Sequence, residues 1–306
     1  MFEKEFHFFM KAMYYSKIID DIIIAVVLSS LVIWVGGYFL KVKNLYKTIA
    51  TVIAVILSIL IVPIPYKREI EQARQKKIAK YNERKAKYEA AKAVFDEQCK
   101  KAGEKIYRTV DNVDGIMLLK IRQRTIEDLN NPMFENAAIA GIESSKGTYI
   151  GSFLHNRAIS KGRRGYLFVD VLKEDGSISR YLDYKGHDDI DEERDGVIKN
   201  PSDLARYAVT YENNVDPELR KYWVAGITIK IIDRQTDELL AEKTIFSFEP
   251  GLGSKAIGRM PWTDWRVEHC PELMRRDVDH NPTQLFAIQV LKPTRFFNSS
   301  FNGDQK

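Results

Sequence analysis

The chain has 306 residues, and its 47 Lys and Arg against 42 Asp and Glu give a formal net charge of +5. The basic excess is concentrated in residues 67–102, and the rest of the chain is close to balanced. This distribution excludes a domain with its own basic face for nucleic acid. About 200 residues follow the basic segment, which is enough for one sizeable hydrophobic core.

Two uncharged apolar runs lie near the N-terminus. Residues 22–40 and residues 48–66 each hold 19 residues without a charge, and a short basic turn separates them. At the helical rise each run spans roughly 28 Å, which matches one hydrocarbon core. Buried core helices rarely form such a pair, and the first run is too long for a cleaved signal peptide. The pattern predicts a transmembrane hairpin within residues 1–66, in contact with lipid and ended by Pro63 and Pro65.

The distribution of Lys and Arg around the hairpin bears on its orientation. An even number of spans places both ends of the chain on one side of the membrane. Lys and Arg on that side outnumber those of the turn, so the positive-inside rule predicts a cytoplasmic soluble part. The turn, however, holds Lys41, Lys43 and Lys47 without an acid, and long domains can cross a membrane whatever their charge. A periplasmic location therefore stays open.

The two cysteines bear on the same question. Cys99 and Cys270 both lie beyond the hairpin. In a cytoplasmic domain they would be free thiols, whereas in a periplasmic domain a Cys99–Cys270 disulfide would be the natural arrangement. Such a bridge would join the end of the juxtamembrane segment to the loop at Pro271.

Residues 67–103 form a basic juxtamembrane segment. The segment lacks proline, is rich in Ala, Lys, Glu and Gln, and ends at Gly103, which predicts a long helix. Tyr81, Tyr88 and Phe95 recur at seven-residue spacing, but lysines occupy the other positions that a coiled coil would fill with apolar residues. We expect a mostly solvated helix near anionic lipid headgroups, with weak self-association through the aromatic stripe as the alternative.

Residues 104–306 read as a strand-rich soluble domain. The isoleucines of Ile227-Thr-Ile-Lys-Ile231 share one face of a strand, and Asp175-Gly176 and residues 233–238 are turn signals. A short helix is expected from Ser202 to Tyr207. The pattern predicts a mostly-β (α+β) domain, an antiparallel sandwich or open barrel with minor helices. The expected strands are residues 105–110, 115–122, 165–172, 178–184, 206–211, 222–232, 239–248 and 284–291.

A glycine-rich stretch follows the seventh of these strands. Gly251, Gly253, Lys255 and Arg259 could cradle a phosphate through backbone N–H groups and two cations. The stretch has neither the spacing of a Walker loop nor a complete GxGxxG motif. An ordinary surface loop is the main expectation, and a site for a phosphorylated small molecule is the alternative.

The sequence holds no recognisable catalytic or metal-binding motif. Residues 268–270 with 277–280 offer metal-ligand types without a known ligand spacing, and residues 187–195 form a contiguous acidic run without the alternation of a calcium loop. Ser152 with His155, and His269 with Cys270, are the only local nucleophile–base pairs, and no nucleophile elbow surrounds them. We therefore expect no enzyme activity, metal or cofactor.

Large aromatics and arginines gather in the loops of the soluble domain. Trp, Tyr and Arg are the residue types that anchor protein interfaces, although core packing claims many tryptophans. The long Gly- and Pro-rich segment around Trp262 is expected to run over the surface. The predicted partner-binding residues are Tyr222, Arg259, Trp262, Trp265 and Arg266.

The stretch KIYRTVDNVDGIMLLK, from Lys105 to Lys120, resembles a group of bacterial membrane-anchored proteins encoded beside type VI secretion effectors. The resemblance also covers the order of hairpin, basic helix and strand-rich domain. It implies an immunity or accessory protein of the inner membrane that binds a toxic effector and has no chemistry of its own. It carries over no site residue, and an effector acting in the periplasm would favour a periplasmic domain.

Overall fold

The computed structural model describes residues 2–41, 43–122, 128–143, 146–154, 165–182, 197–273 and 281–294. The chain divides into two compact units, one up to Lys85 and one from Ala86 onward. The boundary lies inside helix α3 (Pro63–Cys99). Residues 86–99 of the juxtamembrane helix therefore belong to the soluble unit.

The N-terminal unit is a helical hairpin. Helices α1 (Phe2–Phe39) and α2 (Asn44–Ile61) pack against each other, and both are long and apolar enough to cross a membrane. Helix α1 begins well before the predicted span, so the expected N-terminal tail is helical. Pro63 does not end the helical structure as predicted, because it occupies the first position of α3, where its missing N–H costs nothing.

The two helices of the hairpin approach closely near the turn. The alkyl chain of Lys47 lies against Gly37, where a Cβ atom would come within 2.8 Å of the lysine Cε. The Lys47 ammonium lies 5.7 Å from the ring centre of Trp34. Glycine at position 37 thus allows a long cationic side chain to be buried between two apolar helices.

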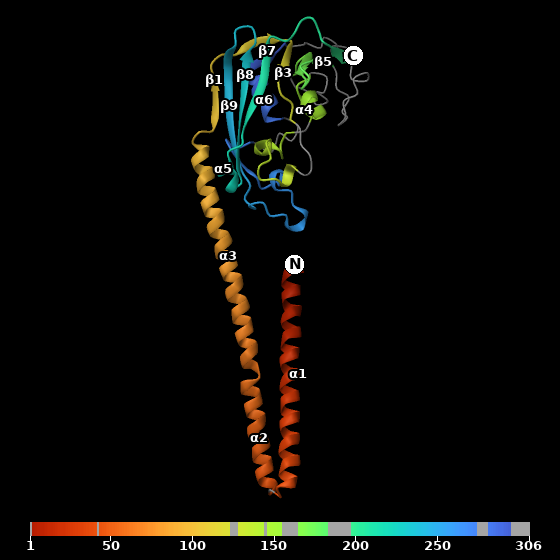
Figure 1. The fold of residues 1–306 in the computed structure, drawn as a ribbon, viewed down its shortest axis with the longest axis vertical. Helices are drawn as coiled ribbons and strands as arrows, with labels where there is room; N and C mark the ends of the chain where they lie inside the picture. The colour runs from red at the N-terminus through yellow and green to blue at the C-terminus, as the bar shows by residue number, and fades with distance from the viewer. Residues whose placement is uncertain are drawn as a thin grey trace, which may run out of the picture. The chain divides into compact units, whose positions relative to one another are not determined.

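The soluble unit is built on an open, mixed nine-stranded sheet (Figure 1). The strand order is β1-β9-β8-β7-β3-β4-β5-β6, and β10 also pairs with β9. Strand β3 is parallel to both β4 and β7, whereas the other pairs of this sheet are antiparallel. The strands are β1 (Gly103–Ile106), β3 (Gly115–Leu118), β4 (Phe168–Leu172), β5 (Ile178–Tyr181), β6 (Ile198–Lys199), β7 (Tyr207–Asn214), β8 (Val224–Asp233), β9 (Glu238–Phe248) and β10 (Glu268–Cys270).

This topology confirms a strand-rich α+β domain and corrects its finer description. The sheet is neither a sandwich nor a barrel, and it is not purely antiparallel. A second, two-stranded parallel sheet pairs β2 (Val110–Val113) with β11 (Leu291–Pro293). Local turn signals predict antiparallel hairpins, and both predicted hairpins form, between β4 and β5 and between β8 and β9. Parallel pairing needs long crossovers, which leave no local signal in the sequence.

One expected strand is a helix. Residues 284–291 lie mostly within α6 (Pro282–Val290), which begins with a proline after Asn281. A short apolar run fits a buried helix as well as a buried strand, and α6 packs against β8 and β9 (Figure 1). The helix expected at residues 202–207 does not form, because residues 201–206 are irregular and β7 begins at Tyr207. The structure adds α4 (Lys146–Ser152), α5 (Pro217–Lys221) and the 3-10 turns η1 (Asp128–Asn130), η2 (Ala137–Ile139), η4 (Ala256–Gly258) and η5 (Pro261–Thr263).

The sheet is covered on both faces. Adjacent strand residues point to opposite faces, so Ile245 and Phe246 of β9 enter different hydrophobic clusters. The larger cluster includes residues of α4, α6 and η2. The smaller cluster joins Phe246 and Phe248 to Ala91 and Phe95 of α3.

The end of α3 is therefore a core element and not a solvated strut. The rings of Tyr88 and Phe95 lie 5.6 and 5.7 Å from the ring of Phe248. Two of the three aromatics of the predicted self-association stripe are thus occupied inside their own domain. Tyr81 stays exposed.

Candidate functional site

The glycine-rich loop after β9 folds around a buried carboxylate. Glu249 has no exposed side-chain surface and accepts hydrogen bonds from the backbone N–H groups of Gly251, at 2.8 Å, and Gly253, at 2.7 Å. The Arg259 guanidinium donates to Glu249 and, through Nε, to Asp264 at 2.5 Å. A Cβ atom at Gly251 would come within 1.5 Å of Nη1, so a larger residue there would displace this guanidinium.

This arrangement corrects the predicted phosphate site. The loop does bind an anion, but the anion is its own Glu249. The N–H groups of Gly251 and Gly253 and the Arg259 cation are already engaged, and Arg259 is buried instead of exposed. Of the four predicted phosphate-binding residues, only Lys255 is exposed to solvent.

Trp262 is a core residue, contrary to the prediction of a contact surface. Its side chain is fully buried, and its indole Nε1 donates to the carbonyl of Asn131 at 2.9 Å. Its ring lies 5.2 Å from the ring of Trp223 and 5.4 Å from the guanidinium of Arg220. Trp262 therefore holds the loop to the domain and is not available to a partner.

The outer side of the same loop presents exposed apolar side chains. Trp265 is 72% exposed, Ile257 is fully exposed, and Met260 is partly exposed. Among the described residues from Ala86 onward, Ile257 and Trp265 are the most exposed large apolar side chains. The predicted residues Arg266 and Tyr222 are also exposed. The sequence prediction missed Ile257 and Met260, although a lone isoleucine between lysine and glycines was a detectable signal.

Asp264 couples the buried network to the exposed rim. Its carboxylate accepts from Arg266 and from Arg259, and these hydrogen bonds hold the pKa of Asp264 well below its ordinary value. The side chain of Arg266 is half exposed, whereas that of Asp264 is nearly buried. The exposed arginine is therefore oriented by a buried carboxylate.

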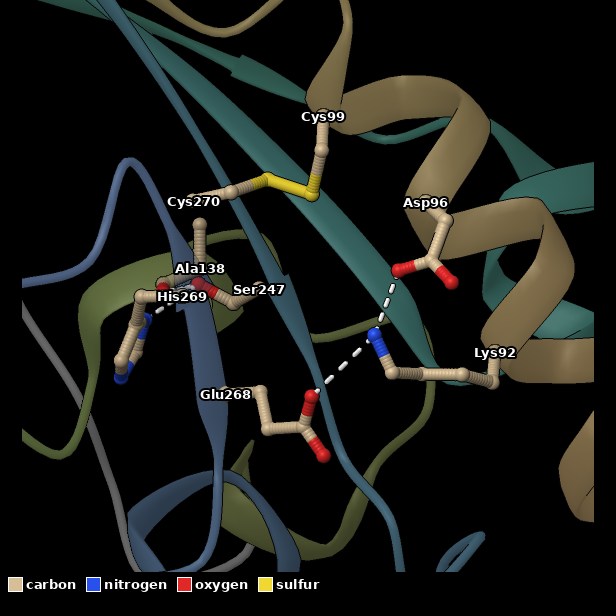
Figure 2. Close-up of a disulfide and its surroundings, with 8 residues drawn as sticks. All are labelled: Lys92, Asp96, Cys99, Ala138, Ser247, Glu268, His269 and Cys270. Atoms are coloured by element: carbon tan, nitrogen blue, oxygen red, sulfur yellow. Dashed lines mark hydrogen bonds and ion pairs between the residues drawn. A yellow bond between two sulfur atoms is a disulfide. The ribbon is translucent and has the colours of Figure 1, made fainter.

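A disulfide joins Cys99 at the end of α3 to Cys270 of β10 (Figure 2). Next to it, the Lys92 ammonium lies between the carboxylates of Asp96 and Glu268, at 3.4 Å from Glu268 (Figure 2). The bridge and the Lys92–Glu268 ion pair join α3 to β10. The two cysteines are therefore paired and not free thiols.

The contact between Ser247 and His269 is structural. The Ser247 hydroxyl donates to the carbonyl of Ala138, so the His269 Nδ1 at 2.7 Å must be the donor to the serine oxygen (Figure 2). Ser247 is completely buried. A serine nucleophile instead needs an accessible oxygen whose proton goes to the histidine. The predicted residues His155 and His280 and the acidic run at 187–195 lie outside the described residues.

A cleft of about 850 Å³ lies beyond the carboxyl ends of β3 and β4. Side chains from the strands, from α4 and from the segments that follow the strands line it. They include Leu119, Lys120, Ile150, Val171, Tyr181 and Tyr211. The lining is mixed, because the two tyrosines and the aliphatic residues are joined by two lysines and by the acids Glu135, Glu174 and Asp175.

Neither feature has a known counterpart that would assign its chemistry. Within the described ranges, no three His, Cys, Asp or Glu side chains are grouped so that they could hold a metal ion. Comparison with known protein families, curated proteins and solved structures found no match. The loop and the cleft must therefore be interpreted from their own geometry.

Proposed function

We propose that the chain is a membrane-anchored binding protein whose strand-rich domain recognises a protein partner. The observation that carries this proposal is the loop between β9 and β10. Its exposed residues Ile257, Trp265 and Arg266 stand on a segment that Trp262 and Glu249 fix from behind. Large apolar and aromatic side chains held rigid before binding lose little conformational entropy when a partner covers them.

The chemistry of this surface favours a protein over a small molecule. The exposed side chains project outward from the loop, whereas small ligands bind in concave sites. Trp, Met and Arg are enriched at protein interfaces, and this one loop exposes Trp265, Met260 and Arg266 together with Ile257. The resemblance of residues 105–120 suggests a secreted toxic effector as the partner, and that identity is the first candidate to test.

We also propose that the soluble domain lies outside the cytoplasm. The Cys99–Cys270 disulfide supports this location, because such bridges persist in oxidising compartments. The turn of the hairpin would then face the cytoplasm with Lys41, Lys43 and Lys47. The count of Lys and Arg on the two sides of the hairpin predicts the opposite, a cytoplasmic domain. That count is a weak guide here, because long domains cross the membrane largely regardless of their charge.

Site-specific photo-crosslinking in native membranes tests the partner surface. A photoreactive phenylalanine analogue replaces Trp265 in the full chain, and the same analogue at the exposed Tyr107 of another loop serves as the control. The proposal expects one stoichiometric protein adduct from position 265 and none from position 107. Identical adducts from both positions, or none from either, would reject the loop as the contact surface.

A further inference from the structure

A buried charged pair lies directly after β3. The Arg122 side chain is 5% exposed, and its Nε donates to the carboxylate of Glu143, which has no exposed surface. The other oxygen of Glu143 accepts from the backbone N–H of Thr283, at 2.7 Å, in the first turn of α6. The pair is therefore anchored at two points, but only through the inner nitrogen of the guanidinium.

Donors around this pair lack acceptors. Both terminal nitrogens of Arg122 are buried without a hydrogen-bond partner, and so is the hydroxyl of Tyr149. The hydroxyls of Tyr149 and Thr283 lie close enough for a side-chain hydrogen bond that acts to lower the pKa of Tyr149, but neither hydroxyl has a partner of ordinary hydrogen-bond geometry. Burial raises the pKa of Tyr149 far above its ordinary value, so its hydroxyl remains a donor. Buried donors are nearly always paired, so a cluster of this kind indicates an absent acceptor.

The donor cluster adjoins the cleft. The Arg122 guanidinium carbon lies 4.1 Å from the ring centre of Tyr211, which lines the cleft, and 6.0 Å from that of Tyr149. Ile121 and Ile150, the chain neighbours of Arg122 and Tyr149, also line the cleft. Arg122 and Tyr149 do not themselves line the cleft, and their unpaired atoms have no exposed surface, so a ligand reaches them only if the side chains between them and the cleft move.

We propose that this cleft binds a small molecule with one carboxylate and an apolar body, and that Arg122 and Tyr149 bind its carboxylate. The two terminal N–H groups of arginine match a carboxylate in geometry. Glu143 already balances the charge of Arg122, so any bound anion adds its own charge to the buried site. A carboxylate adds one negative charge and a phosphate ester up to two, so the carboxylate is the less costly of the two to bury. The aliphatic and tyrosine lining suits the apolar body.

The position of the cleft supports a ligand site. Strands β7, β3 and β4 are parallel neighbours, and open sheets with parallel strands bind ligands beyond the carboxyl ends of those strands. Lys120 and Lys173 line the cleft together with the acids Glu135, Glu174 and Asp175. The Lys120 ammonium lies 5.8 Å from the centre of the Tyr211 ring, which also contacts Arg122. This inference is independent of the partner-binding loop, because none of these residues belongs to residues 249–267.

Calorimetric titration of the full chain in lipid nanodiscs tests the ligand class. The probes are 3-phenylpropionate, its neutral amide and phenyl phosphate, each at millimolar concentration. The proposal expects the carboxylate to bind more tightly than either analogue. Equal binding of the amide or tighter binding of the phosphate would overturn the carboxylate assignment, and no binding of any probe would overturn the site.

A matched pair of tyrosine variants identifies the binding group. Tyr149 and Tyr166 are both fully buried, but only the Tyr166 hydroxyl has a partner, the carbonyl of Leu291 at 2.7 Å. Tyr149→Phe should weaken 3-phenylpropionate by about tenfold, the effect of one hydrogen bond to a charged group, without lowering the melting temperature. Tyr166→Phe should lower the melting temperature and leave the affinity unchanged. Wild-type affinity in Tyr149→Phe would overturn the role of this residue and of the cluster.

Discussion

Trp262 and Trp265 lie three residues apart in one loop but occupy opposite environments. Trp262 is fully buried with its indole nitrogen bonded to Asn131, whereas Trp265 is 72% exposed beside Arg266. One tryptophan fixes the loop, and the other is presented by it. Stability and binding should therefore separate between these two positions.

Alanine substitutions of Trp262 and Trp265 test whether stability and partner binding separate between the two residues. Trp262→Ala should destabilise the domain by about 3–5 kcal/mol, the usual cost of truncating a buried tryptophan. Trp265→Ala should leave the melting temperature nearly unchanged and weaken partner binding by about 2 kcal/mol or more. Thermal unfolding and affinity are measured on both variants in the full chain. If Trp265→Ala unfolds the domain while the folded fraction binds normally, the contact surface is wrongly placed.

Removal of the disulfide tests its contribution to the fold. Cys99→Ser should cost about 2–5 kcal/mol, because the bridge restricts the unfolded chain over a loop of 171 residues. The variant should migrate on gels like the reduced wild-type protein. The wild-type chain, extracted with its thiols blocked, should migrate faster without reductant than with it. Identical migration under both conditions would show that the bridge does not form in the cell.

Reporter fusions test the side of the membrane. Alkaline phosphatase, which is active only in an oxidising compartment, should be active when fused to the C-terminal end of the chain. The same reporter placed after Lys43, in the turn between α1 and α2, should be inactive. The reverse pattern would restore the cytoplasmic location that the charge count predicts.

Arg220 tests the packing behind the loop. Its guanidinium donates hydrogen bonds to two backbone carbonyls, those of Pro132 and Asn214. Burial lowers the pKa of Arg220 to about 10. Arg220→Met should cost about 1–3 kcal/mol for each buried carbonyl left unpaired. The neighbouring variant Lys221→Met, at an exposed position, should unfold like the wild type. Equal unfolding curves for both variants would contradict a structural role for Arg220.

Acid should loosen the loop through Asp264. Its pKa is lowered in the folded state, first by the hydrogen bond from Arg266 and also by Arg259. A carboxyl whose folded-state pKa lies below the unfolded value, about 3.9, stabilises the fold above that pH. This contribution is lost as the pH falls from about 4 through the lowered pKa.

Asp264→Asn isolates this effect. The variant should be less stable at neutral pH, and its melting temperature should fall less than that of the wild type as the solution is acidified below about pH 4. Thermal unfolding at a series of pH values gives both curves. Parallel curves would mean that Asp264 is not responsible for the loss of stability in acid. Asp233 would then be the next residue to test, because its hydrogen bond from Arg206 also lowers its pKa.

The sequence predicted the parts of the fold that depend on residues close together in the chain, namely single strands, tight turns and the two apolar helices. The alternation of Ile227, Ile229 and Ile231 gives one buried face of β8, and the turn after Asp233 joins β8 to β9. The two apolar helices follow from length and composition. The parallel position of β3 depends instead on crossovers between distant segments, and α6 shares its apolar character with a strand, so neither could be predicted.

The candidate site was less predictable than the fold. Residue types pointed to the loop between β9 and β10, which remains a candidate site. The contacts that divide this loop into buried and exposed halves join partners in an irregular segment, such as Glu249 and Arg259. No periodicity connects such residues. The same limit applies to the cleft, because Lys120, Ile150 and Tyr211 come from three separate elements and meet only through the tertiary fold.

The Cys99–Cys270 bridge also determines what a protease would release. The bridge encloses almost the whole sheet, from β1 to β9, within one covalent loop. A single cut at any site between the two cysteines therefore leaves both fragments covalently joined to α1 and α2. Only reduction after the cut would release the C-terminal fragment, so the domain can lose the continuity of its backbone and still stay attached to the two apolar helices.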